Sequence, residues 1–161
     1  MDRQKPLSSK QTMGFGALFA AVGLYFILVG LGLVPVPGGS KALHAPLWIV
    51  ACAGLAFFLG GAAVFMPATV GEPSPNGEMP KNAPRWMYFT QYLFGLAIFV
   101  CFALIGTWIA IGPGPRTFTG TVPVGELGGR IAFGIGAVIV WLATIAVAVS
   151  GARKFLRRDR S

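Results

Sequence analysis

The chain has 161 residues, of which 55% are hydrophobic and 11% charged, and its mean hydropathy is +0.70. Ordinary soluble domains carry about 25% charged residues, and a domain this small has too little interior to bury so much apolar sequence. The composition therefore excludes a soluble globular enzyme, a disordered chain and a disulfide-stabilised scaffold, and it predicts an integral membrane protein. The net charge of +8 has to be interpreted from where the charges lie along the chain.

Four apolar stretches predict four transmembrane helices, which we expect to form a compact all-α bundle within one domain, residues 1–161. Each stretch reaches the ~20 residues that a helix needs to cross the hydrocarbon core, and none contains Lys, Arg, Asp, Glu or His. Lipid offers no hydrogen-bond partners to the backbone, which favours helices, and the lack of alternating polarity argues against a β-barrel. The predicted spans are residues 13–34, 46–66, 86–112 and 131–152.

The first span follows a basic segment, as a signal peptide would. Its apolar run is too long for a cleaved signal peptide and no A-x-A-like site follows it, so an uncleaved signal-anchor is favoured. Proline-containing segments follow each of the first three spans, at residues 34–39, 66–67 and 112–115. Proline cannot continue a helix, and these segments therefore predict where the helices end.

The lysines and arginines predict the orientation of the chain. With the N-terminus in the cytoplasm, only Lys41, Arg116 and Arg130 of the 13 basic residues lie in outer segments. The positive-inside rule then places both termini in the cytoplasm. These features are typical of a small bacterial inner-membrane protein.

The loops between the predicted spans are short, so no soluble domain is expected. Residues 67–85 form a proline-rich connection without periodicity. Within residues 113–129, the β-favouring stretch TFTGTV is compatible with a short β-hairpin over the bundle, although Pro123 limits it.

Small residues recur at helical spacing in each predicted span. Lipid tails are as apolar as leucine, so helices associate through close packing, which small residues permit. These faces are expected to pack the four helices together or to contact another protein. The residues predicted to pack are Gly16, Ala20, Gly23, Gly30, Gly60, Ala132, Gly136 and Ala143.

Four polar side chains within the predicted spans are candidates for ligand or interhelical contacts, namely Tyr25, Gln91, Trp141 and Thr144. If the first and fourth helices touch, Tyr25, Trp141 and Thr144 could meet and line a site for a quinone headgroup or a lipid. A structural interhelical hydrogen bond is the simpler interpretation. Gln91 could bond a neighbouring helix or a lipid headgroup.

The C-terminal segment carries the strongest local charge in the chain. Basic residues beside a span attract anionic lipid headgroups by about 1 kcal/mol each. The cluster predicts contact with such headgroups or with an acidic partner surface, while its juxtamembrane position disfavours nucleic acid. The residues are Arg153, Lys154, Arg157, Arg158 and Arg160.

The sequence supplies no recognisable set of catalytic or metal-binding residues. His44 is the single histidine, and Cys52 and Cys101 lie in different apolar runs with no C-x-x-C motif. A multi-histidine metal site needs more ligands than one chain offers here, and the cysteines are expected to act as small apolar residues. We therefore assign no catalytic residue, no metal and no cofactor.

An accessory or structural subunit that packs against a larger membrane complex fits these features best. No ionisable residue lies within a predicted span, which argues against proton-coupled transport. The alternative is a homo-oligomeric conduit or carrier for a small solute or lipid, lined by Tyr25, Gln91, Thr107 and Thr144. A third hypothesis is a membrane enzyme with its site at an interface. Its titratable residues would be His44, Arg116, Glu126 and Arg130, or Glu72, Glu78, Lys81 and Arg85.

Overall fold

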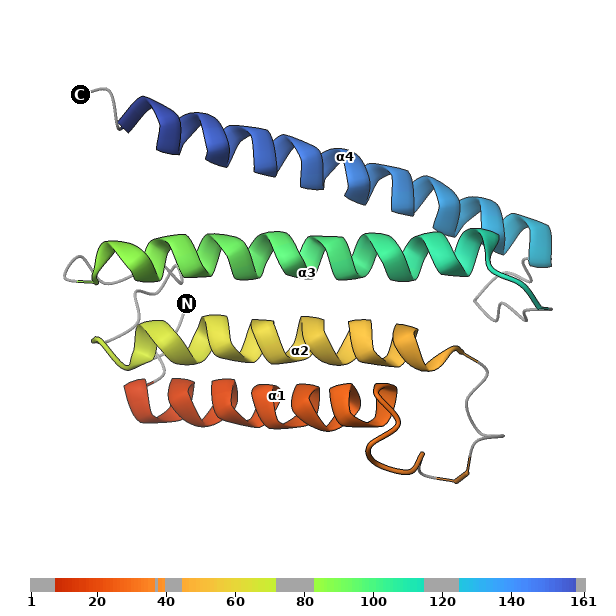
Figure 1. Cartoon of the computed structure of the whole chain (residues 1–161), viewed down its shortest axis with the longest axis horizontal. Helices are drawn as coiled ribbons and strands as arrows, with labels where there is room; N and C mark the ends of the chain where they lie inside the picture. The colour runs from red at the N-terminus through yellow and green to blue at the C-terminus, as the bar shows by residue number, and fades with distance from the viewer. Residues whose placement is uncertain (1–7, 37, 40–44, 72–82, 115–124, 159–161) are drawn as a thin grey trace, which may run out of the picture. The chain divides into compact units, whose positions relative to one another are not determined.

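The computed structural model describes residues 8–36, 38–39, 45–71, 83–114 and 125–158, and these residues form four α-helices and no strand (Figure 1). The helices are α1 (Ser9–Gly30), α2 (Leu47–Ala68), α3 (Arg85–Ile111) and α4 (Glu126–Arg158). Each of the four is long and apolar enough to cross a membrane. The predicted all-helical chain with four candidate membrane spans is therefore confirmed.

The chain forms two compact units, Met1–Ile98 and Phe99–Ser161. The first unit contains α1, α2 and the first half of α3, and the second contains the rest of α3 and α4. Helices α1 and α2 run side by side in opposite directions (Figure 1). At one end of this pair the Ser9 hydroxyl donates to the carbonyl oxygen of Gly71 at 3.2 Å.

Helix α1 begins at Ser9 rather than at residue 13 because a capping box precedes the apolar run. The Ser8 hydroxyl accepts from the Gln11 backbone N–H, and the Gln11 side chain accepts from the Ser8 backbone N–H. The helix ends at Gly30 rather than at residue 34 because Gly32 has a φ of +72°, which a helix cannot contain. The hydropathy of the chain does not report either of these backbone features.

Helix α2 continues through Pro67 and ends at Ala68, whereas the sequence predicted an end at residue 66. Proline in the last turn removes one intrahelical hydrogen bond and need not stop the helix at once. The hydroxyl and the backbone N–H of Thr69 then both donate to the Met66 carbonyl oxygen, at 2.7 and 3.3 Å. Helix α3 differs from its prediction by one residue at each end.

Helix α4 is longer than predicted, because it covers residues 126–158 rather than 131–152. Its 33 residues span about 50 Å at 1.5 Å per residue, compared with a hydrocarbon core of about 30 Å. Glu126 in the first turn favours the earlier start, since it pairs with Arg130 one turn later and lies near the positive end of the helix dipole. The β-hairpin considered for residues 113–129 is unsupported, because residues 126–129 are helical and residues 115–124 lie outside the described part of the chain.

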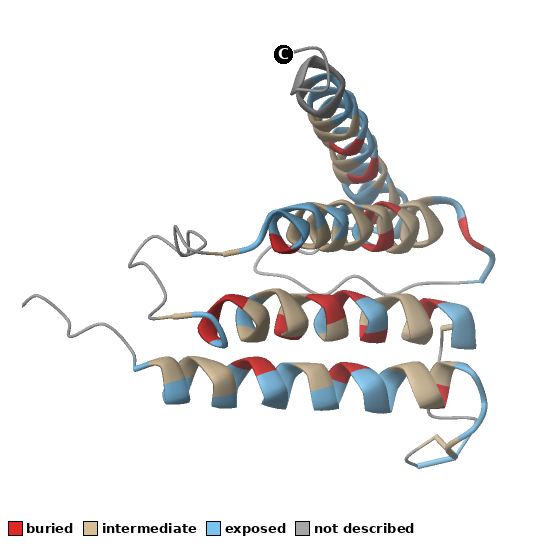
Figure 2. Cartoon of the chain, turned by 60° about the vertical axis from the view of Figure 1, so that its left-hand side comes forward, coloured by how far each residue is buried: buried red, intermediate tan, exposed pale blue. Residues whose placement is uncertain are grey.

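Burial along the helices is the reverse of the pattern in a soluble protein. The buried residues of α1 are Gly16, Gly23 and Val29, while large side chains such as Phe15 and Leu18 are more than half exposed. Figure 2 shows the same pattern in α1, with its buried positions on the side that meets α2. Small residues inside and large apolar residues outside suit helices that associate in lipid.

Candidate functional site

The contact between α1 and α2 is built from glycines that recur every seven residues. Gly16, Gly23 and Gly30 of α1 all lie against the backbone of α2. A Cβ atom built on Gly23 would stand 2.6 Å from the Gly54 carbonyl oxygen, and one built on Gly30 would stand 2.5 Å from the Ala51 nitrogen. Real side chains do not tolerate such distances, so each of these positions requires glycine while the helices stay this close.

The α2 side of this contact is formed by Gly54 and Gly61, which were not among the residues predicted to pack. A Cβ built on Gly54 would stand 2.6 Å from the Ile27 nitrogen, and one built on Gly61 would stand 2.6 Å from the Gly16 carbonyl oxygen. Ala20 also lies at this contact, next to Gly61. Gly60, which was predicted to pack, has open space at its Cβ position. The shared seven-residue spacing was the signal that could have selected Gly54 and Gly61, because it keeps one seam of each helix facing its partner.

Aromatic side chains flank the line of glycines between the helices, the glycine seam, which consists of Gly16, Gly23, Gly30, Gly54 and Gly61. The rings of Phe19 and Phe57 stack across it, with centroids 6.0 Å apart and planes 15° from parallel. Tyr25 is 40% exposed and makes an edge-to-face contact with its neighbour Phe26.

Helices α3 and α4 of the second unit pack antiparallel but less closely. A Cβ built on Gly106 would stand 3.3 Å from the Ala137 Cβ, and one built on Gly134 would stand 3.5 Å from the Ala110 Cβ. These are side-chain contacts near ordinary van der Waals distance, whereas the α1–α2 glycines lie against backbone atoms. This pair therefore has room for alanine at positions where the first pair has none.

An apolar groove of about 480 Å³ runs along this α3–α4 contact. Gly136, one of its lining residues, has nothing within 4 Å of its Cβ position. Ala132, at the same face of α4, is exposed. The groove is lined by Phe102, Ile105, Gly106, Ile109, Ala132, Phe133, Gly136, Ala137 and Val140. Two of the small residues predicted to pack thus line an open groove.

A short chain of hydrogen bonds joins α3 and α4 beside the groove. The Trp141 indole N–H donates to the Thr107 hydroxyl at 3.2 Å, and that hydroxyl donates to the Ala103 carbonyl oxygen at 2.7 Å. The Thr144 hydroxyl is buried and donates to the Val140 carbonyl oxygen within its own helix. The interhelical partner of Trp141 is therefore Thr107. The partners considered from the sequence were Tyr25 and Thr144.

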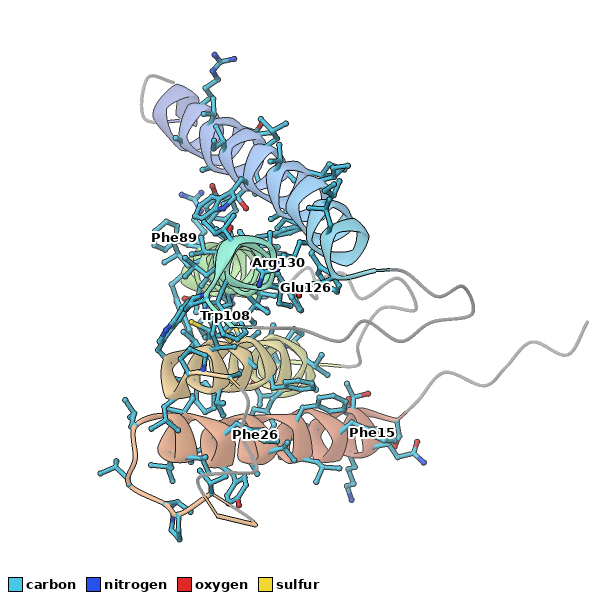
Figure 3. The ribbon with its side chains drawn as sticks, turned by 90° about the vertical axis from the view of Figure 1, so that its right-hand side faces the viewer. Phe15, Phe26, Phe89, Trp108, Glu126 and Arg130 are labelled. Carbon is cyan, nitrogen blue, oxygen red and sulfur yellow. The ribbon has the colours of Figure 1, made fainter. Side chains whose placement is uncertain are left out.

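A charged cluster lies where the connection between α3 and α4 enters α4. The Arg130 guanidinium forms a 2.9 Å salt bridge with Glu126 and donates to the carbonyl oxygens of Gly112 and Gly114, at 3.1 and 2.6 Å. Figure 3 shows Arg130 and Glu126 next to each other at this end of α4. Gly112 and Gly114 follow the end of α3, and Glu126 is the first residue of α4, so the cluster joins the two helices through backbone as well as side-chain groups.

The remaining candidates are dispersed. Gln91 in α3 and Ala143 in α4 are partly exposed, and Arg153 near the end of α4 is exposed. Residues Lys154, Arg157 and Arg158 continue α4, and their side chains, like all of Arg160 and His44, lie outside the described part of the structure.

Neither cysteine forms a disulfide; Cys101 is buried and Cys52 partly exposed. Among the described residues, no group of three or more His, Cys, Asp or Glu side chains could hold a metal ion.

Comparison of the chain with protein-family models, with curated proteins and with solved structures finds no match. The geometry of the two helix pairs is therefore the basis for a functional proposal.

Proposed function

We propose that this protein is an accessory or structural subunit that packs against a larger membrane complex through the α3–α4 groove. The observation that carries the proposal is the open position of Ala132 and Gly136 in that groove. Both are small residues, separated by one helical turn, on a face where the helix backbone is accessible.

Small residues favour the association of helices in a bilayer. They give a helix little contact with lipid chains, but they allow the backbone of a second helix to approach closely, and dispersion contacts then stabilise the pair. In the α1–α2 pair such residues are used in this way within the chain itself. Among the described residues, nothing lies within 4 Å of the Cβ position of Gly136 in α4, and a transmembrane helix of another protein would supply the missing contact.

The apolar lining favours a helix over a polar solute as the occupant. All nine lining residues are apolar, and no ionisable side chain is among them. A conduit for a polar solute needs hydrogen-bonding groups along its path. The accessory subunit is therefore preferred to the homo-oligomeric conduit.

We also propose how the chain lies in the membrane. The four helices would form one compact bundle in a bacterial inner membrane, with both termini in the cytoplasm. The distribution of lysine and arginine supports this orientation. The basic residues from Arg153 onward would then lie at the anionic headgroups of the cytoplasmic leaflet, each favouring that position by about 1 kcal/mol.

Native mass spectrometry of the protein, extracted from its own membrane in mild detergent, tests the proposal. We expect an assembly that contains at least one other, larger membrane protein. A monomer or a homo-oligomer without other chains would contradict the proposal, and a homo-oligomer would favour the conduit.

A pair of matched variants connects that assembly to the groove. Gly136 and Gly60 both lie within helices and both have open space at the Cβ position. Gly136→Ile fills the groove and is expected to remove the larger protein from the assembly. Gly60→Ile makes the same change outside the groove and should leave the assembly intact. Equal behaviour of the two variants would show that the groove is not the binding surface.

A further inference from the structure

The Arg130 side chain contacts three separate groups around the connection between α3 and α4. Its Nε and Nη2 atoms lie 3.0 and 2.9 Å from the Glu126 carboxylate, one turn earlier in α4. Its Nη1 atom donates to the Gly112 carbonyl oxygen directly after α3, and Nη2 also donates to the Gly114 carbonyl oxygen. One side chain of α4 thus binds the end of α3 and the first residues of the connection.

The chemistry of a helix end explains why a cation is suited to this position. The last carbonyl groups of a helix have no intrahelical partner and carry the negative end of the helix dipole. The α3 helix has no basic residue in its own last turn, so Arg130 supplies the missing positive charge from the next helix. The guanidinium is planar and has five donors in a fixed fork, so its three nitrogens can make these four contacts together, whereas a lysine has only three donors on one nitrogen.

The cluster is close in sequence to one end of the groove on both helices. Ile109 is the last groove residue of α3 and precedes Gly112 by less than one turn. Ala132 is the first groove residue of α4 and is separated from Arg130 by a single residue. Further along the two helices, the Trp141 indole donates to the Thr107 hydroxyl, and Gly106 lies beside Ala137. The contacts of Arg130 therefore bear on the separation of the helices at the end of the groove nearest the connection.

We propose that Arg130, oriented by Glu126, is a clasp that fixes the separation of α3 and α4 at the connection and so sets the width of the groove. The clasp itself depends only on contacts within this chain. Its consequence for partner binding rests on the proposed function, because only then does the width of the groove decide what can enter it.

A distance measurement between spin labels at Ile111 and Leu127 tests the clasp in the full-length protein in lipid nanodiscs. Both side chains are more than 70% exposed and lie at the two helix ends that the clasp joins. Cysteines at these positions, on a background carrying Cys52→Ala and Cys101→Ala, would hold the labels. We expect one narrow distance distribution for the chain with Arg130, and a shift to longer distances with broadening for Arg130→Gln.

Two further variants separate the clasp from a general effect of charge. Arg130→Lys keeps the positive charge but cannot reach all three groups, and its distribution should also broaden. Glu126→Gln should broaden it less, because an amide oxygen can still accept from the guanidinium. Lys10→Gln, at an exposed lysine of α1, serves as the control and should leave the distance distribution unchanged.

The outcomes distinguish the clasp from the proposed function. A native distribution in Arg130→Gln would overturn the clasp, whether or not a partner protein is found. A native distribution in Arg130→Lys would overturn the bridging arrangement, and this variant carries the test if Arg130→Gln does not insert into the membrane. A shifted distribution in a chain that has no partner in native mass spectrometry would support the clasp and contradict the proposed function alone.

Discussion

The two helix pairs are both antiparallel and both apolar, but different contacts hold them. In the α1–α2 pair, Gly23 and Gly54 bring the two backbones together, and a single added carbon atom would meet backbone atoms of the other helix. In the α3–α4 pair, the closest small residues meet through side-chain carbons. Arg130 makes polar contacts at the connection, and Trp141 makes one to Thr107 between the helices. The first pair leaves no space between its helices along the glycine seam, whereas the second leaves a groove.

This difference shows two ways to associate helices where burial in lipid provides no driving force. Backbone contact at glycines that recur every second turn yields dispersion energy along the length of the pair. In the second pair, the described polar contacts of Arg130 and Trp141 join the helices, and the apolar groove beside them stays open. The second arrangement is the one expected for a surface that must accept another helix.

The largest effect is expected from a large side chain at the centre of the α1–α2 seam. Gly23→Leu should destabilise the pair by about 3 kcal/mol or more, because the added atoms overlap backbone that cannot move without separating the helices. Unfolding in mixed micelles of mild detergent and sodium dodecyl sulfate measures this change. Gly14→Leu, in the same helix but with nothing within 4 Å of its Cβ position, is the control. Similar losses for the two variants would show that the seam is not as closely packed as described.

A smaller effect is expected from the hydrogen bond between the helices of the second pair. Trp141→Phe and Thr107→Val each remove it, and interhelical hydrogen bonds in membranes contribute about 0.6 kcal/mol on average and about 1.7 kcal/mol at most. A double-mutant cycle measured by the same unfolding experiment isolates the pairwise energy. A coupling energy of zero would mean that the contact at 3.2 Å does not hold the pair together.

The smallest effects are expected from alanine at the glycines of the α3–α4 pair. Gly134→Ala adds a methyl group at ordinary contact distance, and it should be neutral or stabilising by up to about 1 kcal/mol, since alanine also favours the helix. Gly106→Ala, at 3.3 Å from Ala137, should change stability by less than about 1 kcal/mol. Gly23→Ala in the first pair should cost clearly more than either. A ranking in which Gly106→Ala is the most harmful would reverse the comparison of the two pairs.

The sequence predicts the four helices well because the membrane imposes one strong requirement, a long apolar run without charge. It predicts their ends less well. Ser8, Gly32 and Glu126 decide where α1 and α4 begin or end through hydrogen bonds, a positive φ and an ion pair, none of which contributes to hydropathy.

The packing surfaces could be predicted only in part. Gly16, Gly23 and Gly30 of α1 were named as one face, but Gly54 and Gly61 of α2 were not, because α2 contains small residues on several faces and Ala53 and Gly60 share the same seven-residue spacing. The role of Arg130 was not predictable, since its carbonyl partners are Gly112 and Gly114, and a backbone acceptor has no signature in the side-chain sequence.

The most direct test of the central claim is photo-crosslinking from the groove in the native membrane. Benzoylphenylalanine replaces Phe133, which lines the groove, or Ile135, which is 60% exposed on α4 and does not line it. The account predicts that the probe at Phe133 crosslinks to a larger membrane protein, the same one that appears in the native assembly, and that the probe at Ile135 crosslinks to lipid. Crosslinks from Phe133 to lipid alone, or to a second copy of this chain, would contradict the account.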